Sequence, residues 1–374
     1  MKILTTGGHL TPALAFIDFV STQPTPTEFV FLGRNFSQVE NRQRSQESRA
    51  AAEREIPFIQ FQSGKLSFRS PLQLMHQAWQ VMTGLVKAMR ILSAVRPDVV
   101  VLFGGYLAVP VAVAGWLQRI PVITHEQTAV ASLSNQIIGL FSKKIAVSHR
   151  SVSAQFPKSK TVFTGNLLRP KLEGKKSKAP PWFQSNSKYP VLYITGGNQG
   201  SQVINATIAQ VLPQLTRDWS VVHQCGSPTK KTNYSRQLQS NLMQLSKPAQ
   251  NRYHIREWIT EEELAWLYST VAVVISRAGA NTVFELQHFG LPAILIPLPF
   301  SHKQEQLKNA DVAAKSGGYI VLPQNHLTPE SLLSALKKLA ANHIARRKKI
   351  LQRDSSSQGN KKFWKLVQST QKES

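Results

Sequence analysis

Two glycine-rich turns in this sequence have the composition of binding sites for a phosphate or diphosphate group. Thr6-Gly7-Gly8 follows a short apolar run and precedes a helical pattern that starts near Pro12. Gly196 to Gly200 also follows an apolar run and adds amide side chains, at Asn198 and Gln199, as donors. A strand, a glycine turn and a helix N-terminus expose backbone N–H groups to an anion. Neither turn has the P-loop or dinucleotide fingerprint, and a tight turn without a ligand would have the same sequence.

Two carboxylates and one histidine are candidates for chemistry near such turns. Glu285 lies one turn into a helix that follows small residues, where it would bind vicinal ribose hydroxyls or cap the helix. Glu126 follows an apolar run and is the only acidic residue from 99 to 172, so it would be a general base or the partner of a lysine. His9 directly follows the first turn and would be a base or a helix cap.

The elements that must position these residues are short β-branched runs separated by helical stretches. The runs are continuously apolar, as in strands buried on both faces of a parallel sheet. They span residues 29–32, 98–103, 121–124, 191–195, 271–276 and 293–296. Because a strand followed by Thr-Gly-Gly occurs twice, we expect an α/β protein with two Rossmann-like domains, each a doubly wound parallel sheet.

The expected organisation is an N-terminal domain over residues 1–164, a C-terminal domain over 165–345 and a basic tail or helix over 346–374. Residues 171–188 are rich in Lys, Ser and Pro and predict an exposed linker. The uncharged stretch 99–118 is long enough to cross a membrane, but Gly104, Gly105 and Pro110 interrupt it. We therefore expect a strand, a loop and a buried helix there.

The chain has a net charge of +25, from 45 basic and 20 acidic residues, and would be attracted to nucleic acid or to an anionic membrane. Residues 66–92 mix apolar and basic side chains, as in a core helix or a lipid-facing surface. The basic residues of 346–349 and 361–365 suit a solvated helix or a contact with lipid headgroups. A single cysteine, Cys225, excludes an internal disulfide and suits a reducing compartment.

Seven short segments occur along residues 1–320 in one characteristic order. They are Thr6 to Ala15, Gly104 to Tyr106, Pro121 to Gln127, Gly165 to Arg169, Gly196 to Gly200, Gly279 to Glu285 and Gln306 to Ala310. In this order they resemble the MurG family, the UDP-N-acetylglucosamine–N-acetylmuramyl-(pentapeptide) pyrophosphoryl-undecaprenol N-acetylglucosaminyltransferases.

The resemblance implies a GT-B fold, with the nucleotide sugar on the C-terminal domain and the lipid-linked acceptor on the N-terminal domain. Glu285 would bind the ribose, and the diphosphate would be lined by Ala280, Asn281, Thr282, Val283 and Phe284. The remaining substrate-binding residues would be Thr6, Gly7, Gly8, Tyr106, His125, Thr128, Arg169, Asn198, Gln199, Ile259 and Gln306. The base would be His9 or Glu126, and the sugar would be transferred with inversion, without a metal or other cofactor.

The implied partners are a UDP-sugar donor, an undecaprenyl-linked acceptor and an anionic membrane surface, at the cytoplasmic face of a bacterial membrane and without nucleic acid. The sequence departs from the family at the first turn, which lacks two glycines, and at Asn198 and Thr128, where the family has Ser and Asn; residues 34–56 match poorly. The alternatives are a UDP-N-acetylglucosamine 2-epimerase, a glycosyltransferase with another acceptor, an inactive membrane scaffold and a basic nucleic-acid-binding protein.

Overall fold

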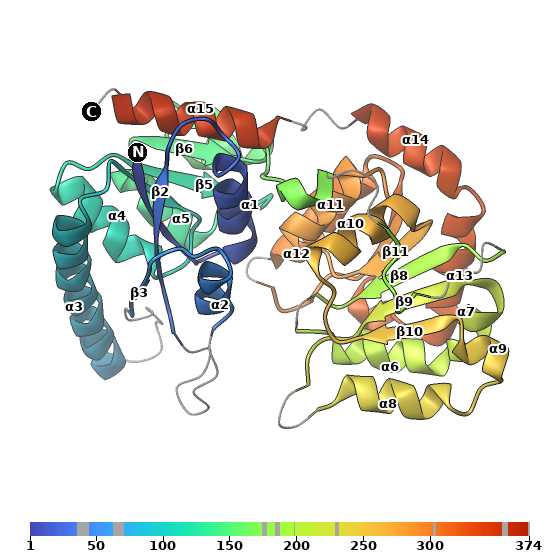
Figure 1. Cartoon of the computed structure of the whole chain (residues 1–374). Helices are drawn as coiled ribbons and strands as arrows, with labels where there is room; N and C mark the ends of the chain where they lie inside the picture. The colour runs from blue at the N-terminus through green and yellow to red at the C-terminus, as the bar shows by residue number, and fades with distance from the viewer. Residues whose placement is uncertain are drawn as a thin grey trace. The chain divides into compact units, whose positions relative to one another are not determined.

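The computed structural model describes residues 1–35, 45–62, 71–173, 178–183, 188–197, 199–228, 232–301, 304–353 and 358–372; for 71–81 and 353 it describes the backbone alone. The chain divides into two compact units (Figure 1). The first comprises Met1–Pro170 together with Gln358–Ser374, and the second comprises Lys171–Ser357.

The first unit is built on a seven-stranded parallel sheet with the order β3-β2-β1-β4-β5-β6-β7. Its strands are β1 (Lys2–Thr6), β2 (Glu28–Gly33), β3 (Phe58–Gln60), β4 (Val99–Leu102), β5 (Val122–Glu126), β6 (Lys144–Val147) and β7 (Thr161–Phe163). The chain runs outward from β1 to β3 and then returns to place β4 on the other side of β1. The doubly wound topology predicted for this part of the chain is confirmed.

Helices cover both faces of this sheet. They are α1 (Leu10–Val20), α2 (Gln46–Ala52), α3 (Pro71–Val95), α4 (Ala108–Leu117), α5 (Leu133–Phe141) and α15 (Gly359–Lys372), with 3-10 turns η2 (Arg150–Gln155) and η3 (Pro170–Glu173). Val99 and Val101 pack toward α1 and α15, whereas Val100 and Leu102 pack toward α3 and α4. Both faces of the strands are buried, which is why their sequences are mostly apolar.

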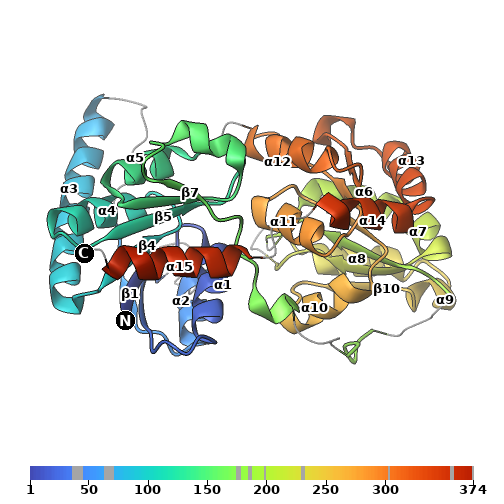
Figure 2. The same cartoon turned by 90° about the horizontal axis from the view of Figure 1, so that it is seen from above.

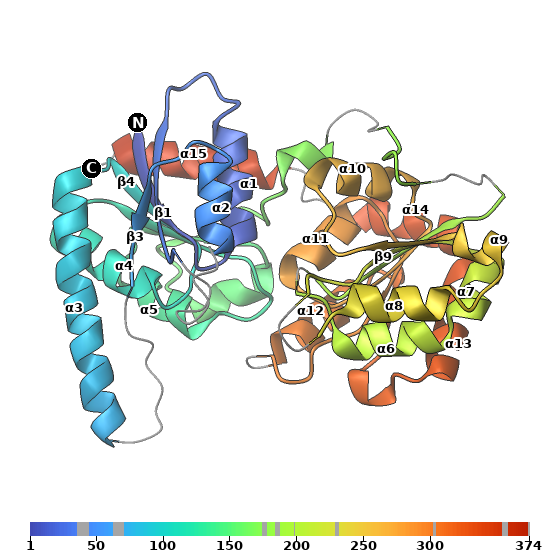
Figure 3. The same ribbon diagram turned by 60° about the horizontal axis from the view of Figure 1, so that its bottom comes forward.

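The second unit repeats this plan with six parallel strands in the order β10-β9-β8-β11-β12-β13. They are β8 (Val191–Thr195), β9 (Ser220–Gln224), β10 (Tyr253–Arg256), β11 (Val273–Ser276), β12 (Ala293–Leu295) and β13 (Tyr319–Val321). The helices are α6 (Gln202–Gln210), α7 (Leu212–Asp218), α8 (Tyr234–Leu242), α9 (Lys247–Gln250), α10 (Glu261–Thr270), α11 (Ala280–His288), α12 (Glu305–Ala314), α13 (Pro329–Ala340) and α14 (His343–Arg353), with a 3-10 turn η5 (Gln324–His326). Helices α6 and α8 lie on one side of the sheet, and α10 and α11 lie on the other (Figure 3).

The described residues of 346–374, expected to form a basic tail or helix, lie in two helices that belong to different units. Helix α14 belongs to the second unit, and α15 returns to the first, where it lies beside α1 (Figure 2). Phe363 and Trp364 are buried in the core of the first unit, and the Asn360 side chain exchanges two hydrogen bonds with the backbone of Leu168, at 2.7 and 3.0 Å. Helix α15 is held because it fills the core with aromatic side chains.

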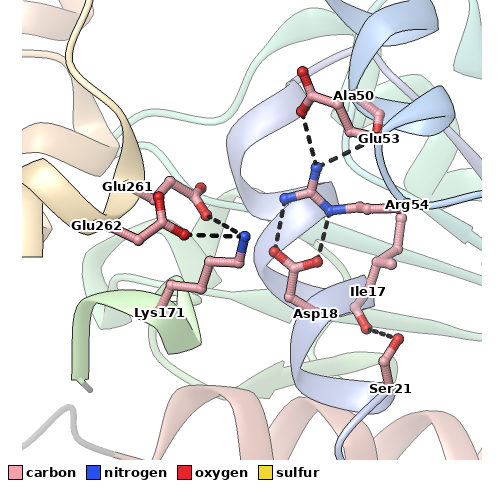
Figure 4. A network of polar contacts seen from close by, with 9 residues as sticks. All are labelled: Ile17, Asp18, Ser21, Ala50, Glu53, Arg54, Lys171, Glu261 and Glu262. Carbon is pink, nitrogen blue, oxygen red and sulfur yellow. Dashed lines mark hydrogen bonds and ion pairs between the residues drawn. The ribbon is translucent and has the colours of Figure 1, made fainter. Parts of the chain in front are cut away.

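The described residues of 171–188 are mostly exposed, as predicted for a linker, but Leu172, Pro180 and Phe183 are buried and others contact the rest of the second unit. Lys171 Nζ lies 3.5 Å from a Glu262 oxygen and 3.9 Å from a Glu261 oxygen at the start of α10 (Figure 4). The indole of Trp182 donates to Glu263 at 2.5 Å. The same view shows Arg54, in the turn after α2, bound to Asp18 of α1 by two hydrogen bonds, at 2.6 and 2.8 Å (Figure 4).

The boundary between the units falls after Pro170 rather than at residue 164. Within the uncharged stretch 99–118, the structure has the expected strand β4, a glycine loop and helix α4. No helix among the described residues is both long enough and apolar enough to cross a membrane.

Candidate functional site

The first glycine turn lies at the point where the order of the first sheet reverses. Strands β1 and β4 are neighbours, although β2 and β3 come between them in the chain. The loops after them touch: a Cβ placed on Gly8 would lie 1.8 Å from the Gly104 carbonyl oxygen, and one on Gly105 would lie 2.6 Å from the Gly8 Cα. Only glycine fits at both positions. Ligands of doubly wound sheets bind at this place.

His9 is the residue that precedes α1, and its side chain makes no capping hydrogen bond to the helix. The ring is partly exposed and lies beside Gly104, with its Cδ2 atom 3.1 Å from where a Gly104 Cβ would be. Burial lowers the pKa of His9 below its ordinary value of 6.5, and the Glu126 carboxylate offsets part of this shift. A neutral imidazole at pH 7 is able to accept a proton.

Glu126, at the end of β5, is fully buried and accepts four hydrogen bonds. Its Oε1 atom accepts from the amide (3.0 Å) and hydroxyl (2.7 Å) of Thr128. Its Oε2 atom accepts from the Ser132 amide (2.9 Å) and from Asn135 Nδ2 (3.0 Å). Burial by itself would raise the pKa of Glu126, but the four hydrogen bonds together lower it by more. The net pKa is therefore below the ordinary value of 4.5. This carboxylate organises the loop that follows β5.

Two further histidines surround this carboxylate. His125 is buried and donates from Nε2 to the Gly165 carbonyl oxygen at 3.1 Å, while its buried Nδ1 has no hydrogen-bond partner. Burial lowers the pKa of His125 to about 4. His149 follows β6, and burial lowers its pKa while Glu126 raises it. His149 was not among the predicted site residues, although it lies two residues after the end of β6, at the same carboxyl edge of the sheet as His125 and Glu126.

The same carboxyl edge has buried polar atoms without a hydrogen-bond partner. They are the hydroxyls of Thr6 and Ser148, the Gln127 side-chain oxygen and His125 Nδ1. Buried polar groups are normally paired, so a ligand or ordered water at this edge would satisfy them. Tyr106, another predicted binding residue, packs against the apolar side chains between α3, α4 and the sheet.

In the second unit the reversal of strand order lies between β8 and β11. The loops after these strands carry the second glycine turn and residues 277–279, which precede α11. Gly279 is the N-cap of α11, and because it has no side chain it makes no capping hydrogen bond to the first amides of the helix. A Cβ placed on Gly279 would lie 3.9 Å from Thr282 Oγ1, so the space beside this residue is open. Ala280, Asn281 and Thr282 form a partly exposed first turn, whereas Val283 and Phe284 are buried. Helix amides of this kind attract a phosphate.

The second glycine turn is held against the loop that follows β9. A Cβ on Gly200 would lie 2.0 Å from the Cys225 carbonyl oxygen, and Gly226 approaches Gly200 equally closely. The Cys225 oxygen accepts a hydrogen bond from Asn205 Nδ2 at 2.9 Å, and Asn205 Oδ1 accepts from His223 Nε2 at 2.9 Å. Burial lowers the pKa of His223 to about 3, so the ring is a neutral part of this hydrogen-bond chain.

The Arg277 side chain donates hydrogen bonds to three other segments of the second unit. Its Nη2 atom donates to the Ser201 hydroxyl and to Gln324 Oε1, both at 2.7 Å, and its Nη1 atom donates to the Ile296 carbonyl oxygen at 3.2 Å. The sequence analysis did not single out Arg277. Its partners lie far away in the chain, and only the folded sheet brings them together.

The remaining predicted residues of the second unit have the following surroundings. Glu285 is buried on α11 and accepts a hydrogen bond from the Tyr268 hydroxyl at 3.0 Å. Gln306 Oε1 accepts from the Leu298 amide at 3.0 Å, Ile259 is buried and Gln199 is exposed.

The predicted residues are divided between the two units. Thr6, Gly7, Gly8, His9, Tyr106, His125, Glu126 and Thr128 belong to the first unit, and the α11 residues, Gln199, Ile259 and Gln306 belong to the second. Arg169, expected on the C-terminal domain, lies in the first unit. Asn198 lies outside the described residues. In the described part of the chain, no group of three or more His, Cys, Asp or Glu could hold a metal ion.

Comparison with known proteins identifies the relatives of this chain. Residues 4–147 match the glycosyltransferase family 28 N-terminal domain, and residues 191–368 match the family 28 C-terminal domain. A protein of Bacillus thuringiensis (strain Al Hakam) named UDP-N-acetylglucosamine–N-acetylmuramyl-(pentapeptide) pyrophosphoryl-undecaprenol N-acetylglucosamine transferase 3 is 31% identical over 92% of this chain and 93% of its own length. A Lactiplantibacillus plantarum protein with the same name, without the numeral, is 32% identical over 89% of this chain and 88% of its own.

Solved structures agree with this relationship. The crystal structure of Acinetobacter baumannii MurG superposes with a TM-score of 0.71 and 26% identity, over 99% of this chain and 100% of that one. A UDP-GlcNAc 2-epimerase from Neisseria meningitidis has a TM-score of 0.65 over 100% of both chains, but its identity of 16% shows the fold alone. The fold is GT-B, and the chain belongs to the MurG family of glycosyltransferase family 28.

Proposed function

We propose that this protein transfers N-acetylglucosamine from UDP-N-acetylglucosamine to the muramyl sugar of a pentapeptide-bearing pyrophosphoryl-undecaprenol, with inversion at the anomeric carbon. The observation that carries the proposal is 31% identity over 92% of the chain to a transferase named for this reaction. The glycine turns at both sheet reversals support it, because a sugar nucleotide and a lipid pyrophosphate each present a diphosphate to bind.

The donor would bind to the second unit. The first amides of α11, with no side-chain cap, would bind the diphosphate, and their partial positive charge would stabilise UDP as it leaves. Glu285 would bind the ribose hydroxyls, and the hydrogen bond from Tyr268 would fix its orientation. Asn198, Gln199, Ile259 and Gln306 would complete the site on the second unit.

The proton of the acceptor hydroxyl would pass to His9. The hydroxyl oxygen would form a bond to the anomeric carbon while UDP leaves with the electron pair of the broken bond. His9 is partly exposed and neutral at pH 7, whereas Glu126 is buried, anionic and bound by four donors. We therefore assign His9 as the base and Glu126 as a residue that positions the loop beside it. His125 and Thr128 would act through this loop, and Tyr106 would contact the acceptor beyond Gly105.

The reaction would not need a metal ion or another cofactor, because helix amides would carry the charge of the leaving diphosphate. We expect EDTA to leave the transfer rate unchanged. A rate that fell with EDTA and returned with a divalent cation would contradict this part of the proposal.

The first unit would rest on an anionic bilayer at the cytoplasmic face of a bacterial membrane. Met82 and Trp116 are both 56% exposed, on α3 and α4, and Leu140 of α5 is 64% exposed. Lys87 and Arg90 of α3 stand in the same region, as expected for a surface at the headgroup boundary. The residues from 66 to 81 that suggested this surface lie outside the described side chains.

The decisive experiment is a transfer assay with radiolabelled UDP-N-acetylglucosamine and undecaprenyl-linked muramyl-pentapeptide. Label is expected in the lipid fraction only when the acceptor is present. Incubation with the sugar nucleotide alone is the control, since epimerisation without acceptor would indicate the 2-epimerase instead. Calorimetry on folded protein that detected no UDP binding would overturn the proposal.

A further inference from the structure

Helix α14 of the second unit lies in the most basic segment of the described chain. From residue 331 to 353 the sequence contains seven lysines and arginines and no acidic residue. The helix is docked by its inner face: Ile350 is buried and occupies the space beside Gly318, and Arg346 donates to the Gly317 carbonyl oxygen at 2.7 Å. Because it is anchored, α14 presents a fixed outer face.

That outer face combines aliphatic and cationic side chains. Ile344 is 65% exposed, and Leu351 is still 47% exposed although one side of it packs against Gly290. The exposed Lys348 lies between them in the chain. Their spacing of four and three residues places them on one side of a helix. Lys349 is exposed next to this stripe. Removing the exposed parts of Ile344 and Leu351 from water is favourable, and Lys348 beside them attracts anions. This stripe therefore fits a partner that has both apolar and anionic parts.

Helix α15 provides an internal comparison. Its lysines Lys361 and Lys365 are exposed, as those of α14 are. Its large apolar residues Phe363, Trp364 and Val367 are instead buried in the first unit. The two helices therefore have similar charge but differ in exposed apolar surface.

We infer that the outer face of α14 is an interfacial contact with an anionic lipid bilayer. Ile344 and Leu351 would enter the boundary between headgroups and acyl chains, and Lys348 and Lys349 would approach the lipid phosphates. A nucleic acid would attract the lysines but would give the aliphatic side chains no apolar environment. The inference adds a second contact to the membrane surface proposed for the first unit, this one on the unit that would hold the donor.

The test measures binding of the full-length protein to vesicles of phosphatidylcholine with and without 30% phosphatidylglycerol. Each lysine near an anionic surface contributes about 1 kcal/mol, so K348Q/K349Q should weaken binding to the anionic vesicles about 30-fold. The matched control K361Q/K365Q removes the same charge from α15 and should weaken binding less than about threefold. Ile344→Ser should weaken it about fivefold, from loss of about 1 kcal/mol of apolar burial.

Equal effects of the α14 and α15 lysine pairs would overturn the inference, as would unchanged binding of Ile344→Ser. Binding of duplex DNA at 0.15 M salt that depends on Lys348 and Lys349 but not on Ile344 would assign the face to nucleic acid instead. Titration of each variant with UDP-N-acetylglucosamine in the absence of vesicles separates the two proposals. A variant that binds the donor normally but has lost vesicle binding supports the membrane contact of α14 and leaves the proposed reaction unaffected. Absence of donor binding in the unmodified protein would contradict the proposed reaction.

Discussion

Replacing Glu126 with glutamine should destabilise the first unit by about 3–6 kcal/mol. The carboxylate accepts four hydrogen bonds, two on each oxygen, and is fully buried. Glutamine has one acceptor oxygen, so its NH₂ group would face two of the present donors. Each lost hydrogen bond to a buried charged group is worth about 1.5–3 kcal/mol.

The pH dependence gives the same substitution a second readout. The pKa of Glu126 is lower in the folded protein than its ordinary value of 4.5. Its ionisation therefore contributes stability that is fully present above about pH 4.5 and is lost as the pH falls through the folded-state pKa. The stability difference between the wild type and Glu126→Gln should accordingly shrink below pH 4.5.

Urea unfolding followed by circular dichroism measures the stability change, and hydrogen exchange of residues 127–135 measures the loop itself. Glu28→Gln is the matched control, because its exposed carboxylate pairs only with Lys2, at 3.6 Å, and should change stability by less than about 1 kcal/mol. A Glu126→Gln variant with unchanged stability and loop exchange, but no transfer activity, would refute the reasoning and make Glu126 the base.

Three further predictions concern the proposed site. His9→Asn should lower kcat about 10²- to 10⁴-fold and abolish the acidic limb of the pH–rate profile, which in the wild type should lie below pH 6.5; an unchanged limb would exclude His9 as the base. Glu285→Ala should weaken UDP binding about 10- to 100-fold by calorimetry, and wild-type affinity would contradict the ribose assignment. Gly200→Ala should raise KM for the donor, since its Cβ would lie 2.0 Å from the Cys225 carbonyl oxygen. Gly317→Ala is the control, because Gly317 also has positive φ, a Cβ there would have no atom within 4 Å, and the residue lies outside the glycine turn; an equal effect would point to backbone strain alone.

Local sequence was sufficient for the two glycine turns and for seven of the thirteen described strands. No predicted run corresponds to β3, β6, β7, β9, β10 or β13. A strand buried on both faces is mostly apolar, so runs such as 99–103 and 191–194 are visible without neighbours, although the buried strand β5 also carries His125 and Glu126. The close approach of Gly8 to Gly104 and of Gly200 to Cys225 requires glycine, and this requirement is visible as a motif in the chain. The order of these motifs also indicated the family that the relatives confirm.

Tertiary structure decided what the polar residues do and where the distant segments belong. The sequence showed Glu126 as an isolated carboxylate, but its pKa and access depend on donors at 128, 132 and 135 that the folded loop brings to it. Basic composition suggested a solvated helix or a lipid contact, yet Phe363 and Trp364 of α15 are buried in the core of the first unit together with residues such as Ile3. Burial and hydrogen-bond partners depend on contacts between residues far apart in the chain, which no local pattern contains.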